Sequence, residues 1–294
     1  MNKNKKDEEQ AKGMLSNVAF FNALNKYIPS LVLQNWMDVH KEQQDEIERA
    51  RVQSKASGTT LPPVVKKQQL PYLQEMETVV LFADISGFTN ISEACAIHGI
   101  RGNEELAFCI NRYMEGMVKN LAKYGGDIIK FVGDAMIVMW PRSKHSDHPD
   151  SNQEDEKVIT IRKAIQCAFD IQQEMNNKKI MANVTNLSVK IGIAFGKTAL
   201  LYVGGVFDRS EFFTVGTALT YALASEEQAT AGGQIIVSDT AFRYVKNQYY
   251  EGTEIISKEN KKFYRITNVV LGVRGRADAV LLKSQIKADK MASV

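Results

Sequence analysis

Apolar and polar positions along the chain predict alternating strands and helices from about Glu77 onward. The continuous apolar run Thr78–Asp84 predicts a buried strand that ends in a carboxylate. Asn103–Tyr124 has helical spacing and is followed by two glycines that end a helix. One face of this predicted helix carries the apolar residues Leu106, Ile110, Met114, Met117 and Leu121. Asp127–Trp140 contains two short apolar runs around Gly133 and Asp134, which predicts a β-hairpin.

The second half of the pattern continues in the same alternating way. It predicts a helix over Lys157–Met175, three strands, another helix near Ala218–Ala229 and a last strand at Gln234–Val237. The three strands are expected at Leu187–Phe195, about Thr198–Val203 and about Phe212–Val215. This order predicts an α/β (α+β) sandwich, a ferredoxin-like split βαβ mixed sheet with helices on one face.

Two of the predicted strands are apolar on both faces, so the second face of the sheet also needs a cover. These strands are Val79–Ala83 and Ile128–Val132. A partner domain is the favoured cover, and the apolar stretch Val18–Trp36 of the same chain is the alternative.

The chain divides into four segments by composition. Residues 1–15 are a charge-rich lead that we expect to be disordered, and residues 16–72 form a helical and linker segment in which Pro29 breaks or restarts a helix. Residues 73–270 carry the alternating pattern and form the main domain, and residues 271–294 form a tail.

Composition and charge exclude several classes of protein. With 294 residues, 44% hydrophobic and 24% charged, the chain is neither globally disordered nor fibrous. The 37 Lys and Arg against 34 Asp and Glu give no bulk charge for binding nucleic acid or a membrane. The three cysteines lack CxxC spacing, which indicates a reduced, cytoplasmic compartment. No apolar run reaches the roughly 20 residues of a membrane-spanning helix, so no transmembrane segment is expected.

Two carboxylates occupy positions that favour chemistry. Asp84 ends the first predicted strand, and Asp134 lies at the tip of the hairpin. Each alone is an ordinary turn former. If the hairpin pairs beside the first strand, however, both lie at one end of the sheet, where a divalent cation would relieve their repulsion. Mg²⁺ suits oxygen ligands together with substrate phosphates, and the turn after Asp84 offers backbone N–H groups to an anion.

Three segments carry a resemblance to a known family. They are FADISGFT (Phe82–Thr89), GGDIIKFVGDAMIVMW (Gly125–Trp140) and KIGIAFG (Lys190–Gly196). Together they resemble the catalytic domain of class III adenylyl and guanylyl cyclases, from about Glu77 to Val237. The likeness is closest to the first catalytic domain of the bicarbonate-responsive soluble adenylyl cyclases.

The resemblance implies a set of site residues. Two Mg²⁺ or Mn²⁺ ions would be held by Asp84, Asp134 and the backbone carbonyl of Ile85. The backbone amides of Ser86, Gly87, Phe88 and Thr89 would bind phosphate. Lys130 falls where relatives contact the purine or line a regulatory anion pocket, although it is also compatible with a solvated lysine on an edge strand.

The matching helix lacks the residues that complete the site in the family. Relatives carry an Asn that orients the ribose and an Arg that stabilises transition-state charge, but Thr220 and Ala224 stand at these positions. Phe213 stands where a purine-reading Asp or Thr often occurs, and Leu223 where the soluble subgroup binds bicarbonate with an Arg. No complete set of catalytic residues is therefore expected in this chain.

Two functions remain open at this stage. The first is the metal-binding half of a cyclase that converts ATP to cyclic AMP and pyrophosphate, with a second cyclase-like domain as partner. The second is a non-catalytic scaffold or regulatory module that keeps the cyclase fold. The resemblance implies a cytoplasmic location, or a ciliary or flagellar one.

Overall fold

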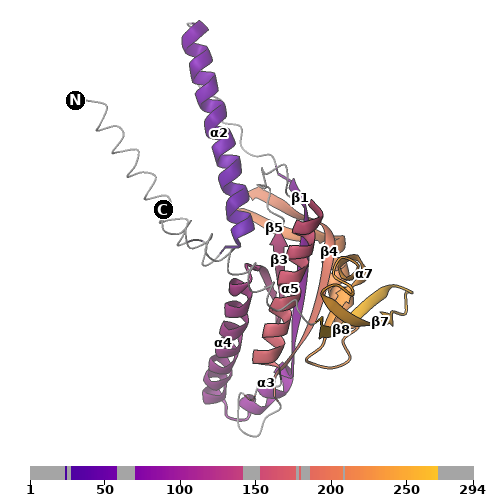
Figure 1. Cartoon of the computed structure of the whole chain (residues 1–294). Helices are drawn as coiled ribbons and strands as arrows, with labels where there is room; N and C mark the ends of the chain where they lie inside the picture. The colour runs from indigo at the N-terminus through magenta and orange to yellow at the C-terminus, as the bar shows by residue number, and fades with distance from the viewer. Residues whose placement is uncertain are drawn as a thin grey trace, which may run out of the picture. The chain divides into compact units, whose positions relative to one another are not determined.

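The structure of the chain is a computed structural model (Figure 1) that describes residues 24, 28–57, 70–141, 153–176, 179, 186–207 and 209–270. It divides into two units, one of Met1–Tyr72 with Tyr202–Glu211, the other of Leu73–Leu201 with Phe212–Val294. The predicted disordered lead 1–15 and the predicted tail 271–294 lie outside the described residues, as does Gly58–Pro63, whose glycine and paired prolines predict a segment boundary. No helix among the described residues is both long and apolar enough to cross a bilayer.

The first unit is dominated by one helix. Helix α2 (Ser30–Ser57) begins directly after Pro29, whose carbonyl accepts hydrogen bonds from the N–H groups of Val32 and Leu33. The proline therefore starts a helix, as its fixed φ favours. The helix continues through the polar stretch after His40, which lies in the segment 16–72 predicted to be partly helical and partly linker.

The sheet has eight strands in the order β2-β3-β1-β4-β6-β8-β7, with β5 paired to β4. Strands β1 and β3 are antiparallel, whereas β4 and β6 are parallel, so the sheet is mixed as predicted. The strands are β1 (Tyr72–Ser86), β2 (Asp127–Val132), β3 (Ala135–Pro141), β4 (Ser188–Val206), β5 (Arg209–Gly216), β6 (Ile235–Ser238), β7 (Tyr250–Ile256) and β8 (Lys262–Val269).

Five helices accompany these strands in the described part of the second unit. They are α3 (Phe88–Ala96), α4 (Ile100–Lys123), α5 (Gln153–Met175), α6 (Thr217–Glu227) and the short α7 (Asp239–Phe242). Helices α4 and α5 are tied together by hydrogen bonds from Tyr124 and Lys123 to Asp170. The predicted hairpin and the predicted helices over 103–124, 157–175 and 218–229 are present.

Three features of the sequence pattern were misread. Helix α3 was not predicted, because Gly87 and the polar residues after it are typical of a turn. The two strands expected at 187–195 and 198–203 are one strand, β4, which runs through Gly196, and the start of α6 passes close to that glycine. Helix α7 and strands β7 and β8 were missed, since they lack long apolar runs.

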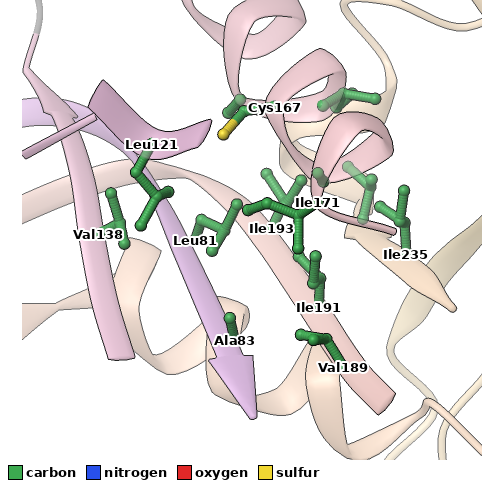
Figure 2. Close-up of a cluster of buried hydrophobic side chains, with 14 of the residues drawn as sticks. Leu81, Ala83, Leu121, Val138, Cys167, Ile171, Val189, Ile191, Ile193 and Ile235 are labelled. Carbon is green, nitrogen blue, oxygen red and sulfur yellow. The ribbon is translucent and has the colours of Figure 1, made fainter. Parts of the chain in front are cut away.

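The core lies between the sheet and helices α4 and α5 (Figure 2). Figure 2 shows side chains from four strands meeting side chains from these two helices. The strands contribute Leu81, Ala83, Val138, Val189, Ile191, Ile193 and Ile235, and the helices contribute Leu121, Cys167 and Ile171. The members from β1 and from β4 are each two residues apart along their strand, which is the alternation expected of a strand with one face on the core.

Helix α6 packs against the sheet at Gly192. A Cβ atom on Gly192 would overlap the carbonyl oxygen of Ala222 and the backbone nitrogen of Glu226. Because Gly192 alternates with Ile191 and Ile193, α6 lies on the opposite face from α5. The chain thus covers part of the second face with its own α6, whereas the sequence suggested a partner or Val18–Trp36.

Gly192→Ala should lower the free energy of unfolding by about 1–3 kcal/mol, because backbone atoms of α6 have to move to admit the methyl group. For a domain of this size, that is a fall in melting temperature of roughly 2–10 °C. Gly116→Ala is the matched control. Its added methyl would meet only the flexible end of the Met175 side chain, so that variant should keep its melting temperature. Equal effects of the two substitutions would contradict the packing of α6.

Candidate metal and phosphate site

Strand pairing brings the two predicted carboxylates to the same end of the sheet. Ala83 of β1 pairs with Met136 of β3, so Asp84, the next residue on β1, lies beside the start of β3. Asp134 immediately precedes β3 in the hairpin turn, where Gly133 has a φ of 64°. The hairpin prediction and its consequence for the two carboxylates are therefore consistent with the observed register.

The electrostatics of Asp84 reflect this neighbourhood. Burial raises the pKa of the Asp84 carboxyl, the negative charge of Asp134 raises it further, and the ammonium of Lys190 opposes both effects. Two neighbouring carboxylates are a suitable oxygen donor set for a divalent cation. Ile85, whose carbonyl the resemblance adds to this set, follows Asp84 directly and is buried.

The predicted phosphate-binding turn is the beginning of a helix. Ser86 ends β1, Gly87 is the N-cap with a φ of 97°, and Phe88 and Thr89 open α3. A Cβ on Gly87 would lie 3.1 Å from the carbonyl oxygen of Asn186, so both conformation and space call for glycine. Since the first N–H groups of a helix have no partner within it, this end of α3 can receive an anion.

Two charged residues near the carboxylates were missed by the sequence analysis. Burial raises the pKa of Glu226, the charge of Asp84 raises it further, and Lys190 lowers it. Lys190 therefore acts on both carboxyl groups. One signal was present in the sequence: Lys190 and Gly192 share a face of β4, and Gly192 is the point where Glu226 approaches.

Lys130 occupies an exposed position on β2. A register shift between Ile128 and Lys130 breaks the simple alternation expected over Ile128–Val132. The Lys130 ammonium lies 5.7 Å from the ring centroid of Phe213, within cation–π range. The structure thus brings together two positions that the resemblance assigns to purine or anion contact.

Helix α6 presents short side chains at the positions where the family carries its Asn and Arg. The hydroxyl of Thr220 donates to the carbonyl of Gly216, 3.2 Å away, and so is occupied within the helix. Ala224 offers no polar group, and α6 contains no arginine. The described residues include no cluster of three or more His, Cys, Asp or Glu side chains able to hold a metal ion, so a metal at Asp84 and Asp134 would take its other ligands from backbone, substrate or water.

Large apolar side chains are exposed near this site. Phe131 and Val132 on β2 are 51% and 47% exposed, and Phe213 on β5 is 48% exposed. β2 and β5 are not adjacent in the sheet, but Lys130 of β2 lies 5.7 Å from the Phe213 ring of β5. Exposed apolar residues that lie near one another are typical of an interaction surface.

Comparison with known proteins agrees with this architecture. The family model described as the adenylate and guanylate cyclase catalytic domain matches residues 71–268. Adenylate cyclase type 10 of Rattus norvegicus is 29% identical over 168 residues, which are 56% of this chain and 10% of that protein. The chain therefore matches only about a tenth of the length of this relative.

Solved structures show the same fold. The adenylyl cyclase CyaB from P. aeruginosa has a TM-score of 0.50 at 23% identity, covering 67% of this chain and 96% of that one. The guanylyl cyclase domain of a RhoGC fusion protein from Blastocladiella emersonii, in a double-mutant form, has a TM-score of 0.51 at 19% identity, covering 68% and 99%.

Proposed function

The chain belongs to the adenylate and guanylate cyclase family, and we propose that it is the metal-binding half of a nucleotide cyclase that needs a complementary second domain. The observation that carries this proposal is the pairing of Asp84 with Asp134 beside a helix that has Thr220 and Ala224 in place of Asn and Arg. The proposed reaction converts ATP to cyclic AMP and pyrophosphate.

The proposed chemistry is an in-line displacement at phosphorus. The ribose 3′-hydroxyl releases its proton to solvent, its oxygen forms a bond to the α-phosphorus, and the bond from that phosphorus to the pyrophosphate oxygen breaks. Two Mg²⁺ or Mn²⁺ ions, when bound, would activate the hydroxyl and neutralise the triphosphate. Asp84, Asp134 and the Ile85 carbonyl would hold them.

The start of α3 would position the phosphates. The backbone amides of Ser86, Gly87, Phe88 and Thr89 lie directly after the metal-binding Asp84, so one short segment would serve both the metals and the triphosphate. Lys130 would contact the purine or line an anion pocket, and its ammonium lies 5.7 Å from the ring centroid of Phe213.

The partner would have to supply what this chain lacks. Charge spreads over the phosphate oxygens in the transition state, and no arginine of α6 is present to meet it. The exposed Phe131, Val132 and Phe213 would form part of the surface on which the second domain docks. Two copies of this chain would each lack the same groups, so the partner is proposed to be a different cyclase-like domain.

A non-catalytic scaffold or regulatory module is the second candidate. It is favoured by the loss of Asn and Arg together with the presence of Phe213 at the purine-reading position. The retained Asp84, Asp134 and Gly87 favour the first proposal, because a scaffold has no need of two neighbouring carboxylates.

Calorimetry with Mg²⁺ and a non-hydrolysable ATP analogue tests the proposal. The chain should bind the analogue with a micromolar dissociation constant, and Asp84→Asn and Asp134→Asn should each weaken binding at least about tenfold, since each loses a charged metal ligand. Glu104→Gln, on the exposed side of α4, is the control and should bind normally. Weak binding that neither Asp substitution alters would support the scaffold instead.

The pH dependence of stability gives a second measurement on the same variants. Because the pKa of folded Asp84 is raised, its ionisation costs stability as the pH rises through that pKa. Without metal, Asp84→Asn should therefore raise the melting temperature more at pH 8 than at pH 5. Mn²⁺ should raise the melting temperature of the unsubstituted chain more at pH 8 than at pH 5, since the metal competes with protons for the carboxylates.

A further inference from the structure

Strand pairing places Lys190 of β4 opposite Asp84 of β1. The two strands are neighbours in the sheet, and just beyond their ends a Cβ on Gly87 would lie 3.6 Å from the side chain of Leu187. Gly87 follows Asp84 by three residues, and Leu187 precedes Lys190 by three. In an antiparallel pair, this contact brings Asp84 and Lys190 face to face.

The other end of the same two strands gives the same register. The ring centroids of Tyr72 and Tyr202 lie 5.9 Å apart, so the start of β1 meets the end of β4 and the strands run antiparallel. Tyr72 precedes Asp84 by 12 residues, and Tyr202 follows Lys190 by 12. Both contacts therefore place Asp84 and Lys190 opposite each other.

Asp84 and Lys190 lie on the face of the sheet that carries α6. Their neighbours Ala83 and Ile191 belong to the core on the other face, and side chains alternate between the two faces along a strand. Facing residues of an antiparallel pair have Cβ atoms about 4.5–5.5 Å apart. The Lys190 ammonium can therefore reach the Asp84 carboxylate.

The packing of α6 fixes Glu226 on the other side of Lys190. A Cβ on Gly192 would lie 2.9 Å from the Cβ of Glu226, and Gly192 is two residues beyond Lys190 on the same face of β4. Two residues of a strand span about 7 Å, which a lysine side chain can bridge. Lys190 can thus turn toward Asp84 across the sheet or toward Glu226 above it.

The electrostatics of the three groups agree with this arrangement. Burial raises the pKa of Asp84 and of Glu226, and the Lys190 ammonium lowers both. All three side chains are half-buried, so their charges interact more strongly than in bulk water. Within the described part of the chain, Lys190 forms no ion pair with either carboxylate. Its charge is therefore shared between the two carboxylates.

We propose that Glu226 is a positioning residue that draws the Lys190 ammonium toward α6 and keeps Lys190 from closing an ion pair with Asp84. The inference rests on the proposed function, because it concerns cation binding at Asp84. A lysine paired with Asp84 would occupy its carboxylate oxygens and repel a cation. Glu226 thus keeps Asp84 available, although Glu226 itself would contact neither the metal nor the nucleotide.

Calorimetry of the full chain with Mn²⁺ alone at pH 8 tests this role. Glu226→Gln should weaken Mn²⁺ binding about two- to fivefold, the range expected of a partly exposed ion pair, and Lys190→Met should tighten it by a similar factor. Added to Lys190→Met, however, Glu226→Gln should leave the affinity unchanged, because no ammonium remains to be positioned.

A matched control removes the same charge from the next residue of α6. Glu227 is exposed, so Glu227→Gln should bind Mn²⁺ as the parent does. If Glu226→Gln weakened binding equally with and without Lys190, it would act through its own charge or through the packing of α6, and the proposal would be overturned.

Melting temperatures without metal test the same role independently of cation binding. At pH 8, Asp84→Asn should raise the melting temperature of the parent, because it removes a carboxylate whose ionisation costs stability. In the Glu226→Gln chain the same substitution should lower the melting temperature instead, since Asp84 would there be paired with Lys190. A rise in both chains would contradict the positioning role.

The two proposals fail on different results. Mn²⁺ binding that Asp84→Asn leaves intact would contradict the metal site itself. Mn²⁺ binding that depends on Asp84 but is equally tight in the parent and in Glu226→Gln would contradict only the role of Glu226.

Discussion

Mixing this chain with a complementary cyclase domain should raise the rate of cyclic AMP formation from ATP at least about 10³-fold over the chain alone. The added domain would supply the Arg and Asn that Thr220 and Ala224 cannot replace, and an arginine finger in phosphoryl transfer contributes about 10³–10⁵ in rate. A suitable partner is a homodimeric class III domain whose own metal-binding aspartates are replaced by Asn. Such a domain is inactive by itself but keeps its Arg.

Product analysis with Mn²⁺ and ATP measures this result. Asp84→Asn or Asp134→Asn in this chain should return the mixture to background, because no intact pair of carboxylates would remain. Glu104→Gln should leave the mixture fully active. Two results would contradict the proposal that this chain supplies the metal ligands and its partner the Arg and Asn. One is turnover of ATP by the chain alone at a rate typical of an enzyme, and the other is full activity of the mixture with either aspartate variant.

Restoring the missing groups in this chain should create an active homodimer. In the triple variant Phe213→Thr, Thr220→Asn, Ala224→Arg, each copy would offer metals to one pocket and the Arg and Asn to the other. Replacing single transition-state donors typically changes rates by about 10²–10³, so a gain of at least that size over the parent is expected. The activity should rise with the square of protein concentration at low concentration, since two copies build each site.

The matched control carries Lys in place of Arg at position 224. Arginine presents a planar set of donors that lysine lacks, so the lysine version should recover much less activity. Addition of Asp134→Asn to the active triple variant should abolish its activity. A triple variant that dimerises and binds nucleotide without turnover would contradict the role assigned to α6.

The sequence predicted the elements that carry the two carboxylates, β1 and the β2–β3 hairpin, but not α3, which begins directly after them at the phosphate-binding turn. β1 ends in Asp84 after a continuous apolar run, and the hairpin turn at Gly133 and Asp134 has the expected composition. These features depend on local pattern, namely apolar runs and turn residues, which a single sequence displays directly. The proximity of Asp84 and Asp134 followed from them once the hairpin was assumed to pair with β1.

The features that the sequence did not predict depend on contacts between segments distant in sequence, which the local pattern of residues does not display. Gly196 suggests a strand break, but it lies inside β4, where Thr217 and Ala218 of α6 approach it and leave little room for a side chain. Lys190 and Glu226 are 36 residues apart in sequence, and only the packing of α6 on Gly192 brings them to Asp84. The edge hairpin of β7 and β8 has too few apolar residues to be recognised from its pattern.

The contact of α6 with Gly192 has a consequence for how binding events would be communicated. Because Gly192 has no Cβ, the backbone of α6 packs directly on β4, and no side chain lies between them to absorb a movement of the helix. Lys190 is two residues away on the same strand, and its charge acts on Asp84. A protein that binds the outer side of α6 and shifts the helix would therefore also move Lys190 and Glu226. Such a shift would change the affinity of Asp84 and Asp134 for cations.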